Sequence, residues 1–152
     1  MNALRWAAWL AGLWTGLLAA IGLMAAPTAF AALPRELAGL VAGRLFAQEA
    51  YAGLVFAVVL FLILRQQARR AAQAGAGSVL SADMLLALGA LFCTVVGYFA
   101  LQPMMVAARA AQGGLSFGAL HGISSALFAG KGVLVGVLAW RLSGALSRRP
   151  SS

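Results

Sequence analysis

Four long apolar runs, separated by short polar segments, dominate the chain. They cover approximately residues 6–26, 38–64, 84–101 and 118–141. A helix needs about 20 apolar residues to cross a hydrocarbon layer about 30 Å thick, and each run approaches or exceeds that length. The pattern predicts an all-α integral membrane protein with four transmembrane helices in an up-down bundle, forming a single membrane domain over residues 1–152.

Polar and helix-breaking residues indicate where these helices begin and end. Pro27 closes the first run, and Pro34 is expected at or near the first position of the second helix, where proline is tolerated. The segment 66–81, rich in Arg, Gln and Gly, is expected to be the loop between two helical hairpins. Ser81 is expected to cap the third helix, and Gln102-Pro103 to end it.

The first run has a second interpretation, as a signal peptide. Arg5 precedes it, and Ala29-Phe30-Ala31 has the small residues of a cleavage site. The apolar core of a signal peptide is about 7–15 residues long, which is shorter than this run. The length therefore favours a retained membrane span.

The composition places the protein in lipid. Hydrophobic residues make up 63% of the chain and charged residues 9%, and the mean hydropathy is +0.94. An ordinary soluble domain has about 45–50% apolar and about 25% charged residues. So few ionised groups cannot solvate a globular surface, which excludes a water-soluble globule and the cofactor-binding α/β domains.

The excess of basic residues predicts the orientation. Lys and Arg total 11 against 3 acidic residues, a net charge of +8. Basic residues of membrane proteins gather on the cytoplasmic side, so the side shared by both termini and the central loop is predicted to be cytoplasmic. That side carries Arg5, Arg65, Arg69, Arg70, Arg141, Arg148 and Arg149, with Trp6, Trp9 and Trp140 as an aromatic belt. Nucleic acid is not an expected partner, because DNA binding needs a basic face on a soluble module.

Polar residues from three of the predicted helices converge on the outer third of the bilayer. Counted at 1.5 Å per residue from the inner end of each run, Glu49 lies about 24 Å away, and Arg44, Gln102 and His121 about 28–31 Å away. Polar groups at membrane depth are costly, so each is a functional hypothesis. The alternatives are a polar network that fastens the helices, or residues at the headgroup boundary. The candidate functional cluster is Arg44, Gln48, Glu49, Gln102, His121, Ser124, Ser125 and Lys131.

Lys131 lies nearest the middle of the membrane, about 15 Å from the inner end by the same count. An ammonium group at that depth needs a partner or a water-filled cavity. Asp83 and Glu49 are the only carboxylates associated with the spans, and neither is level with Lys131 by counting. No partner for Lys131 is predicted.

Metal, haem and hydrolytic chemistry have weak support. His121, Met104 and Met105 are candidate soft ligands for copper or haem, but the chain has one histidine and one cysteine and no paired-ligand spacing. Ser124 and Ser125 lie near His121 without a third member of a triad. We expect no enzyme, no metal and no cofactor, with a metal- or haem-handling protein that uses His121 as the minor alternative.

Pairs of glycines one helical turn apart predict close helix contacts, within the chain or in a homodimer. They are Gly12 and Gly16, Gly39 and Gly43, Gly118 and Gly122, and Gly132 and Gly136. The two halves of the chain also share landmarks, since Pro27 and Pro103 each close a run. These landmarks alone do not establish an internal repeat.

Several short motifs resemble a known family. They are Pro27-Thr-Ala-Phe, Ala42-Gly-Arg-Leu-Phe, Gln102-Pro-Met-Met, Phe117-Gly-Ala-Leu-His-Gly-Ile-Ser-Ser and Ala139-Trp-Arg. They are similar to motifs of small bacterial four-span membrane proteins grouped as a domain of unknown function and related to the eukaryotic transmembrane protein associated with cisplatin resistance. The resemblance implies a protein of the bacterial cytoplasmic (inner) membrane, of unestablished activity, associated with export or drug tolerance. Its polar marks would be Arg44, Gln102, Pro103, His121, Ser124 and Ser125.

Two functional hypotheses follow. The first is a small transporter, acting as a homo-oligomer because four short helices enclose little space, with the candidate cluster along a polar route. The second is a non-catalytic membrane scaffold or accessory subunit of a larger complex, whose polar residues hold helices or a partner.

Overall fold

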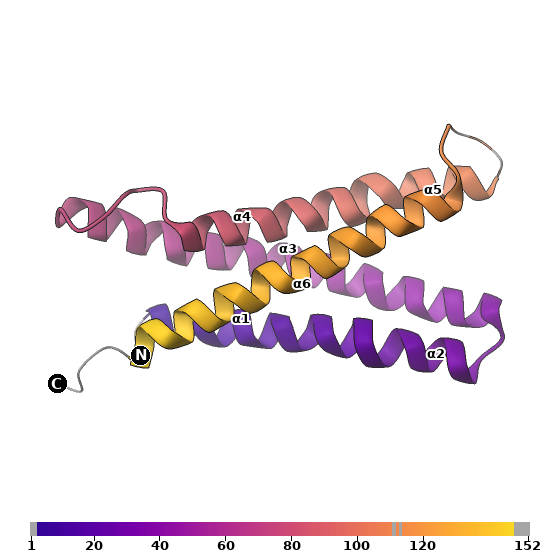
Figure 1. Ribbon diagram of the computed structural model, residues 1–152, viewed down its shortest axis with the longest axis horizontal. Coiled ribbons are helices and arrows are strands. Elements are labelled where there is room, and N and C mark those ends of the chain that lie inside the picture. The colour runs from indigo at the N-terminus through magenta and orange to yellow at the C-terminus, as the bar shows by residue number, and fades with distance from the viewer. Residues whose placement is uncertain (1–2, 111, 113, 148–152) are drawn as a thin grey trace.

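The computed structural model describes residues 3–110, 112 and 114–147. Four helical rods run antiparallel (Figure 1). The first consists of α1 (Ala3–Ala19), a π-helical turn η1 (Ala20–Ala25) and α2 (Ala26–Ala32), and the second is α3 (Arg35–Gln73). The third consists of α4 (Ala82–Thr94), a π-helical turn η2 (Val95–Ala100) and α5 (Leu101–Arg109), and the fourth is α6 (Phe117–Ser147). All four rods are long and apolar enough to cross a membrane, which confirms the predicted fold class.

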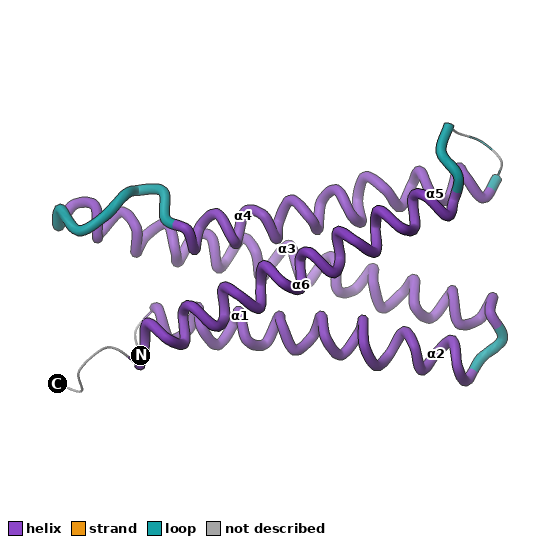
Figure 2. Tube along the Cα trace, viewed as in Figure 1, coloured by secondary structure: helices purple, strands orange, loops and turns teal. Residues whose placement is uncertain are grey.

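The rods form a bundle with two diagonal pairs. α1 and α4 each pack against both α3 and α6, whereas the described residues of α3 and α6 make no close backbone approach to each other. The start of α1 and the end of α6 lie at the same end of the bundle as the 74–81 loop (Figure 2). We call this end the terminal half, and the part beyond η1 and η2 the distal half.

The main core lies in the terminal half. Alanines on three rods are fully buried there, among them Ala11, Ala57 and Ala87, with Leu60 and Leu138 between the helices. Small residues let membrane helices approach closely. Because lipid is as apolar as the side chains, the helices associate through van der Waals packing and not through the hydrophobic effect. Large apolar side chains point outward instead, as lipid requires, including Leu13, Val55, Phe92 and Val133.

The distal half is open by comparison. There α2 packs on α3 and α5 packs on α6, and the two hairpin ends diverge (Figure 1). Among the described residues, α2 makes no close backbone approach to α5 or α6. The bundle is therefore joined along one half and divided along the other.

The helices do not end at the two prolines, contrary to the expectation from sequence. The first rod continues through Pro27 to Ala32, and the third continues through Pro103 to Arg109. Proline lacks an N–H and its ring crowds the carbonyl four residues earlier. A π-helical turn precedes each proline, at Ala20–Ala25 and at Val95–Ala100, and such a wide turn accommodates a break in the hydrogen-bond ladder.

The predicted loop at 66–81 is wrong in its first half, because α3 continues to Gln73. The residues after Arg65 are Gln, Ala and Arg, which are good helix formers even outside lipid. The helix ends in a Schellman motif: the Ala76 N–H donates to the Ala71 carbonyl, and Gly75, at φ +68°, donates its N–H to Ala72. The loop proper is 74–81.

The helix starts agree with the sequence. The Ser81 hydroxyl accepts a hydrogen bond from the Met84 N–H at 3.3 Å, which confirms the predicted cap. α3 begins directly after Pro34, which occupies the capping position. Ser116 caps α6 in the same way, accepting from the Ala119 N–H at 3.2 Å.

Three of the four glycine pairs do not lie at contacts within the chain. A Cβ added at Gly12, Gly16, Gly39, Gly43, Gly118 or Gly122 would meet open space. In the fourth pair only Gly136 has a neighbour, the Thr15 methyl at 3.8 Å from such a Cβ. The homodimer contact remains a prediction for these pairs.

Candidate functional site

A charged hydrogen-bond network lies in the centre of the bundle. Lys131 Nζ on α6 donates to Glu49 Oε2 on α3 at 2.6 Å, and Trp14 Nε1 on α1 donates to Glu49 Oε1 at 3.1 Å. All three side chains are buried, with relative exposures of 0% for Trp14, 2% for Glu49 and 3% for Lys131. Both carboxylate oxygens thus have a donor, and the ammonium has its counter-charge.

The expectation that Glu49 is not level with Lys131 is wrong. α3 continues to Gln73 and α6 continues to Ser147, so neither Arg65 nor Arg141 marks the end of its rod, and counts begun at these two arginines do not start from one level. The rods also cross at an angle (Figure 1), which a count along each helix ignores. The long Lys131 side chain closes the remaining offset, because lysine carries its charge on a flexible four-carbon stem.

Aromatic rings enclose the network on two sides. Toward the distal half, the Phe128 ring centroid lies 5.1 Å from Lys131 Nζ and 5.0 Å from the Phe46 ring, edge to face. Toward the terminal half, Trp14 stacks on Phe56 at 5.8 Å. A lysine over a ring face gains cation–π attraction, most strongly where water is excluded.

Gly53 provides the space in which Trp14 meets Glu49. It lies one helical turn from Glu49 on α3, and a Cβ there would lie 3.1 Å from Glu49 Oε1 and 3.3 Å from Trp14 Cζ2. Any larger residue would press on both partners of the hydrogen bond. The absent side chain is therefore part of the site.

The network joins the two diagonal helices across the middle of the bundle. Since the described parts of α3 and α6 make no close backbone approach, side chains hold them together, through Glu49 with Lys131 and Phe46 with Phe128. The pair thus links the two diagonal helices at the level where the hairpin ends begin to diverge.

Just distal to the pair, α6 packs against both π-helical turns. A Cβ on Gly22 in η1 would lie 2.8 Å from Phe128 Cε1, and one on Gly97 in η2 would lie 3.2 Å from Leu127 Cβ. Ser124, one turn further along, donates its hydroxyl to the Gly97 carbonyl at 2.9 Å. In a regular α-helix the Leu101 N–H would donate to the Gly97 carbonyl, but here it donates to the carbonyls of Val96 and Tyr98. The Ser124 hydroxyl therefore supplies a donor to Gly97 at the irregular turn.

The other predicted site residues are not brought together. Arg44 and Gln48 are exposed on α3, His121 and Ser125 are exposed on α6, and Gln102 is half-buried on α5. The eight candidates thus divide into the Glu49–Lys131 pair, the Ser124 bond at η2, and separate positions on helix surfaces.

His121 belongs to a short stack at the distal end. Its ring lies parallel to Phe117 at 5.8 Å, and Arg109 lies over the Phe117 ring with Cζ at 4.5 Å from the centroid. Met105 packs with Leu101 and Leu120 in a small apolar cluster. The described residues contain no group of three or more His, Cys, Asp or Glu side chains that could hold a metal ion.

Sequence reasoning missed two partners. Trp14 was an ordinary apolar residue of the first run, although a buried indole N–H needs an acceptor and could have directed attention to Glu49. Arg141 Nε donates to Asp83 Oδ1 at 2.6 Å, so a second ion pair joins α6 to the first turn of α4. Arg148 and Arg149 lie outside the described residues.

The fold and the site define a small polytopic helical membrane protein with an ion pair in its centre. Residues 9–113 match the family described as "Domain of unknown function (DUF4149)", and the chain belongs to that family. The matched part includes Trp14 and Glu49, whereas Lys131 lies beyond it. No curated protein and no solved structure matches the chain.

Proposed function

We propose that this protein is a small proton-coupled membrane transporter in which the Glu49–Lys131 pair is the gate. The observation that carries this proposal is the position of the pair, buried between two diagonal helices that only side chains join. A carboxylate and an ammonium inside a membrane are expensive, and charges there mark substrate pathways and proton relays. A well-packed apolar pair would hold the helices at least as well.

A proton supplies a simple way to open such a gate. Protonation of Glu49 removes the negative charge that holds Lys131, and the ammonium then has no counter-charge among its contacts. The pair separates because an unpaired buried charge is strongly unfavourable. The enclosing rings of Phe46 and Phe128 would move with the helices that carry them.

The irregular turns supply the hinges for this movement. η1 and η2 lie at the level where the hairpin ends diverge, each followed by a proline. π-helical turns occur frequently at functional sites, and broken helices near the membrane midplane are a feature of many transporters. α2 packs on α3 and α5 packs on α6, so a pivot of α2 and α5 about these turns would release the distal parts of the two helices that carry the gate.

Proton flux into proteoliposomes tests the proposal. The protein is reconstituted around the pH dye pyranine, and a potassium gradient with valinomycin drives proton entry. Wild type is expected to carry protons faster than empty vesicles. Glu49→Gln should reduce the protein-dependent rate at least tenfold, because glutamine lacks the charge of Glu49 and cannot bind and release the proton that crosses the site. Glu36→Gln is the matched control, since Glu36 is an exposed carboxylate on the same helix. Equal rates in a folded Glu49→Gln protein and in wild type would overturn the proposal.

A scaffold or accessory subunit is the second candidate. It is favoured by polar side chains on exposed helix surfaces, namely Arg44, Gln48, His121 and Ser125. Lipid does not satisfy such groups, so a partner helix would. In this case Arg44→Leu and His121→Leu would reduce co-purification of a partner or of a second copy, and proton flux would be absent in wild type as well.

We also propose that both termini are cytoplasmic, in the inner membrane of a bacterium. The basic residues at the terminal half support this orientation. Reporter fusions after Ser147 and within 74–81 should both be active in the cytoplasm. A periplasmic signal from either fusion would contradict the orientation. An association with export or drug tolerance belongs to the same proposal and rests on the motifs alone.

A further inference from the structure

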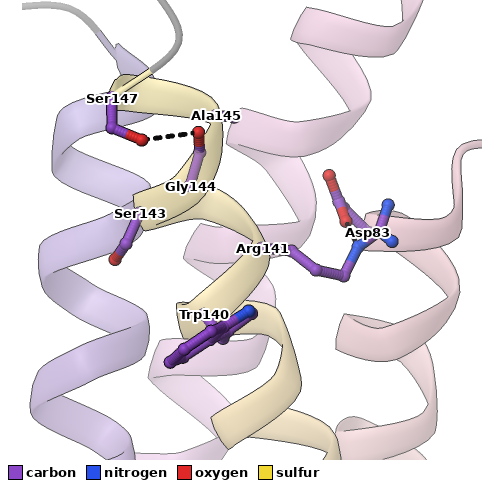
Figure 3. A pocket seen from close by; sticks show the side chains of 7 residues that line it. All are labelled: Asp83, Trp140, Arg141, Ser143, Gly144, Ala145 and Ser147. Carbon is purple, nitrogen blue, oxygen red and sulfur yellow. Dashed lines mark hydrogen bonds and ion pairs between the residues drawn. The ribbon is translucent and has the colours of Figure 1, made fainter.

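A shallow, open hollow of about 640 Å³ lies beside the end of α6, and Figure 3 shows the side chains that line it. Trp140, Arg141, Ser143 and Ser147 line it from α6, and Asp83 lines it from the first turn of α4. It lies where buried Leu138 and Leu142 give way to the polar end of the bundle. The hollow therefore opens at the boundary between apolar and aqueous surroundings.

Arg141 is positioned to receive a phosphate group. Its Nε donates to Asp83 at 2.6 Å, and the side chain is 49% exposed. Among the described residues, the hydrogen bond of this guanidinium uses Nε alone, which leaves the terminal N–H groups for an anion. Such groups bind phosphate oxygens in a bidentate fork. Ser143, which also lines the hollow, points away from α4 on the other side of α6 (Figure 3).

An apolar track leads away from the hollow along α6. Val133, Val137 and Trp140 follow one another at intervals of four and three residues, so they share a face of the helix. They are exposed by 65%, 43% and 83%. A large exposed ring at a membrane boundary commonly lies at headgroup level, and the valines continue toward the level of Lys131.

We infer that this hollow binds an anionic phospholipid. The phosphate contacts Arg141, and an acyl chain lies along Trp140, Val137 and Val133. A soluble phosphate compound would use the guanidinium without the apolar track.

Thermal unfolding of detergent-purified protein tests the inference. Phosphatidylglycerol is expected to raise the Tm of wild type, and phosphatidylcholine and inorganic phosphate are not. Arg141→Gln should weaken the apparent affinity for phosphatidylglycerol about tenfold, the effect of losing a hydrogen bond to a charged group. Native mass spectrometry of retained lipid gives a second readout that does not depend on unfolding.

Two control variants separate specific binding from other effects. Arg65→Gln removes an exposed charge from the same end and should keep the wild-type lipid response. Asp83→Asn breaks the ion pair and should also keep it, because Arg141 remains. An unchanged response in Arg141→Gln, an equal loss in Arg65→Gln, or an equal Tm increase with inorganic phosphate would each overturn the inference. Loss of the response in Asp83→Asn would assign the effect of Arg141 to the ion pair and overturn it as well.

Discussion

The terminal and distal halves of the bundle are held together in different ways. In the terminal half, all four rods share one core of buried alanines and leucines. Among the described residues of the distal half, the two hairpins make no close backbone approach to each other, and the second core is a small cluster of Leu101, Met105 and Leu120. Close packing of small residues thus joins the rods at one end, whereas the described residues at the other end form no core shared by all four rods.

The ion pair lies at the boundary between these two regimes. Glu49 and Lys131 meet where the shared core ends, and Phe128 and Leu127 press on the two irregular turns immediately beyond. Charge and shape, rather than apolar area, therefore control the junction between the two halves.

Breaking the central pair should have the largest effect. Lys131→Met leaves Glu49 buried without its counter-charge, and we expect a loss of about 3–5 kcal/mol in the free energy of unfolding. The double variant Glu49→Leu/Lys131→Met should recover most of this loss, because no buried charge remains. Equilibrium unfolding in mixed micelles measures both. Equal losses in the single and the double variant would contradict a charge-based junction.

Filling the irregular turns should have the next largest effect. Gly22→Ala and Gly97→Ala introduce a Cβ at 2.8 Å from Phe128 Cε1 and at 3.2 Å from Leu127 Cβ. Overpacking of this kind costs about 1–3 kcal/mol. Gly12→Ala is the matched control in the terminal half, since a Cβ there meets open space, and it should be neutral or stabilising. A comparable Tm decrease in all three variants would show that close packing at the π-helical turns does not cause the effect.

Removing the indole donor should have a moderate effect. Trp14→Phe keeps the stack on Phe56 but leaves Glu49 Oε1 without its 3.1 Å hydrogen bond. We expect a loss of about 1–3 kcal/mol, the penalty for a buried group without a partner. Trp9→Phe, at an exposed position on the same helix, is the control. Unfolding curves that coincide for Trp14→Phe and wild type would remove Trp14 from the network.

The smallest effect is expected at Ser124. Ser124→Ala removes the bond to the Gly97 carbonyl, and side-chain hydrogen bonds between membrane helices are worth about 0.6 kcal/mol on average. Ser125→Ala changes the neighbouring exposed hydroxyl and should leave the Tm unchanged. A larger effect at Ser125 than at Ser124 would place the functional contact of α6 on its outer surface.

Local features of this protein could be predicted because they depend on neighbours in the chain. The apolar runs predicted the four rods, and Ser81 predicted the cap of α4, because membrane crossing and capping use residues within one segment. The position of Lys131 near the middle of the membrane could also be predicted, because it depends only on where the lysine lies within its own apolar run. The prolines misled because a π-helical turn can accommodate them within a helix.

Only the tertiary structure decided which of the polar residues meet. Glu49 and Lys131 are 82 positions apart, and Trp14 and Glu49 are 35 apart, so their meeting depends on the tilt and offset of three rods. A count of residues along separate helices contains neither quantity. The amino-acid sequence was enough to predict the lipid environment, the number of helical rods and the presence of charges that need partners. The packing of small residues between the rods then brought two of those charges together and left Arg44, Gln48, His121 and Ser125 on the surface.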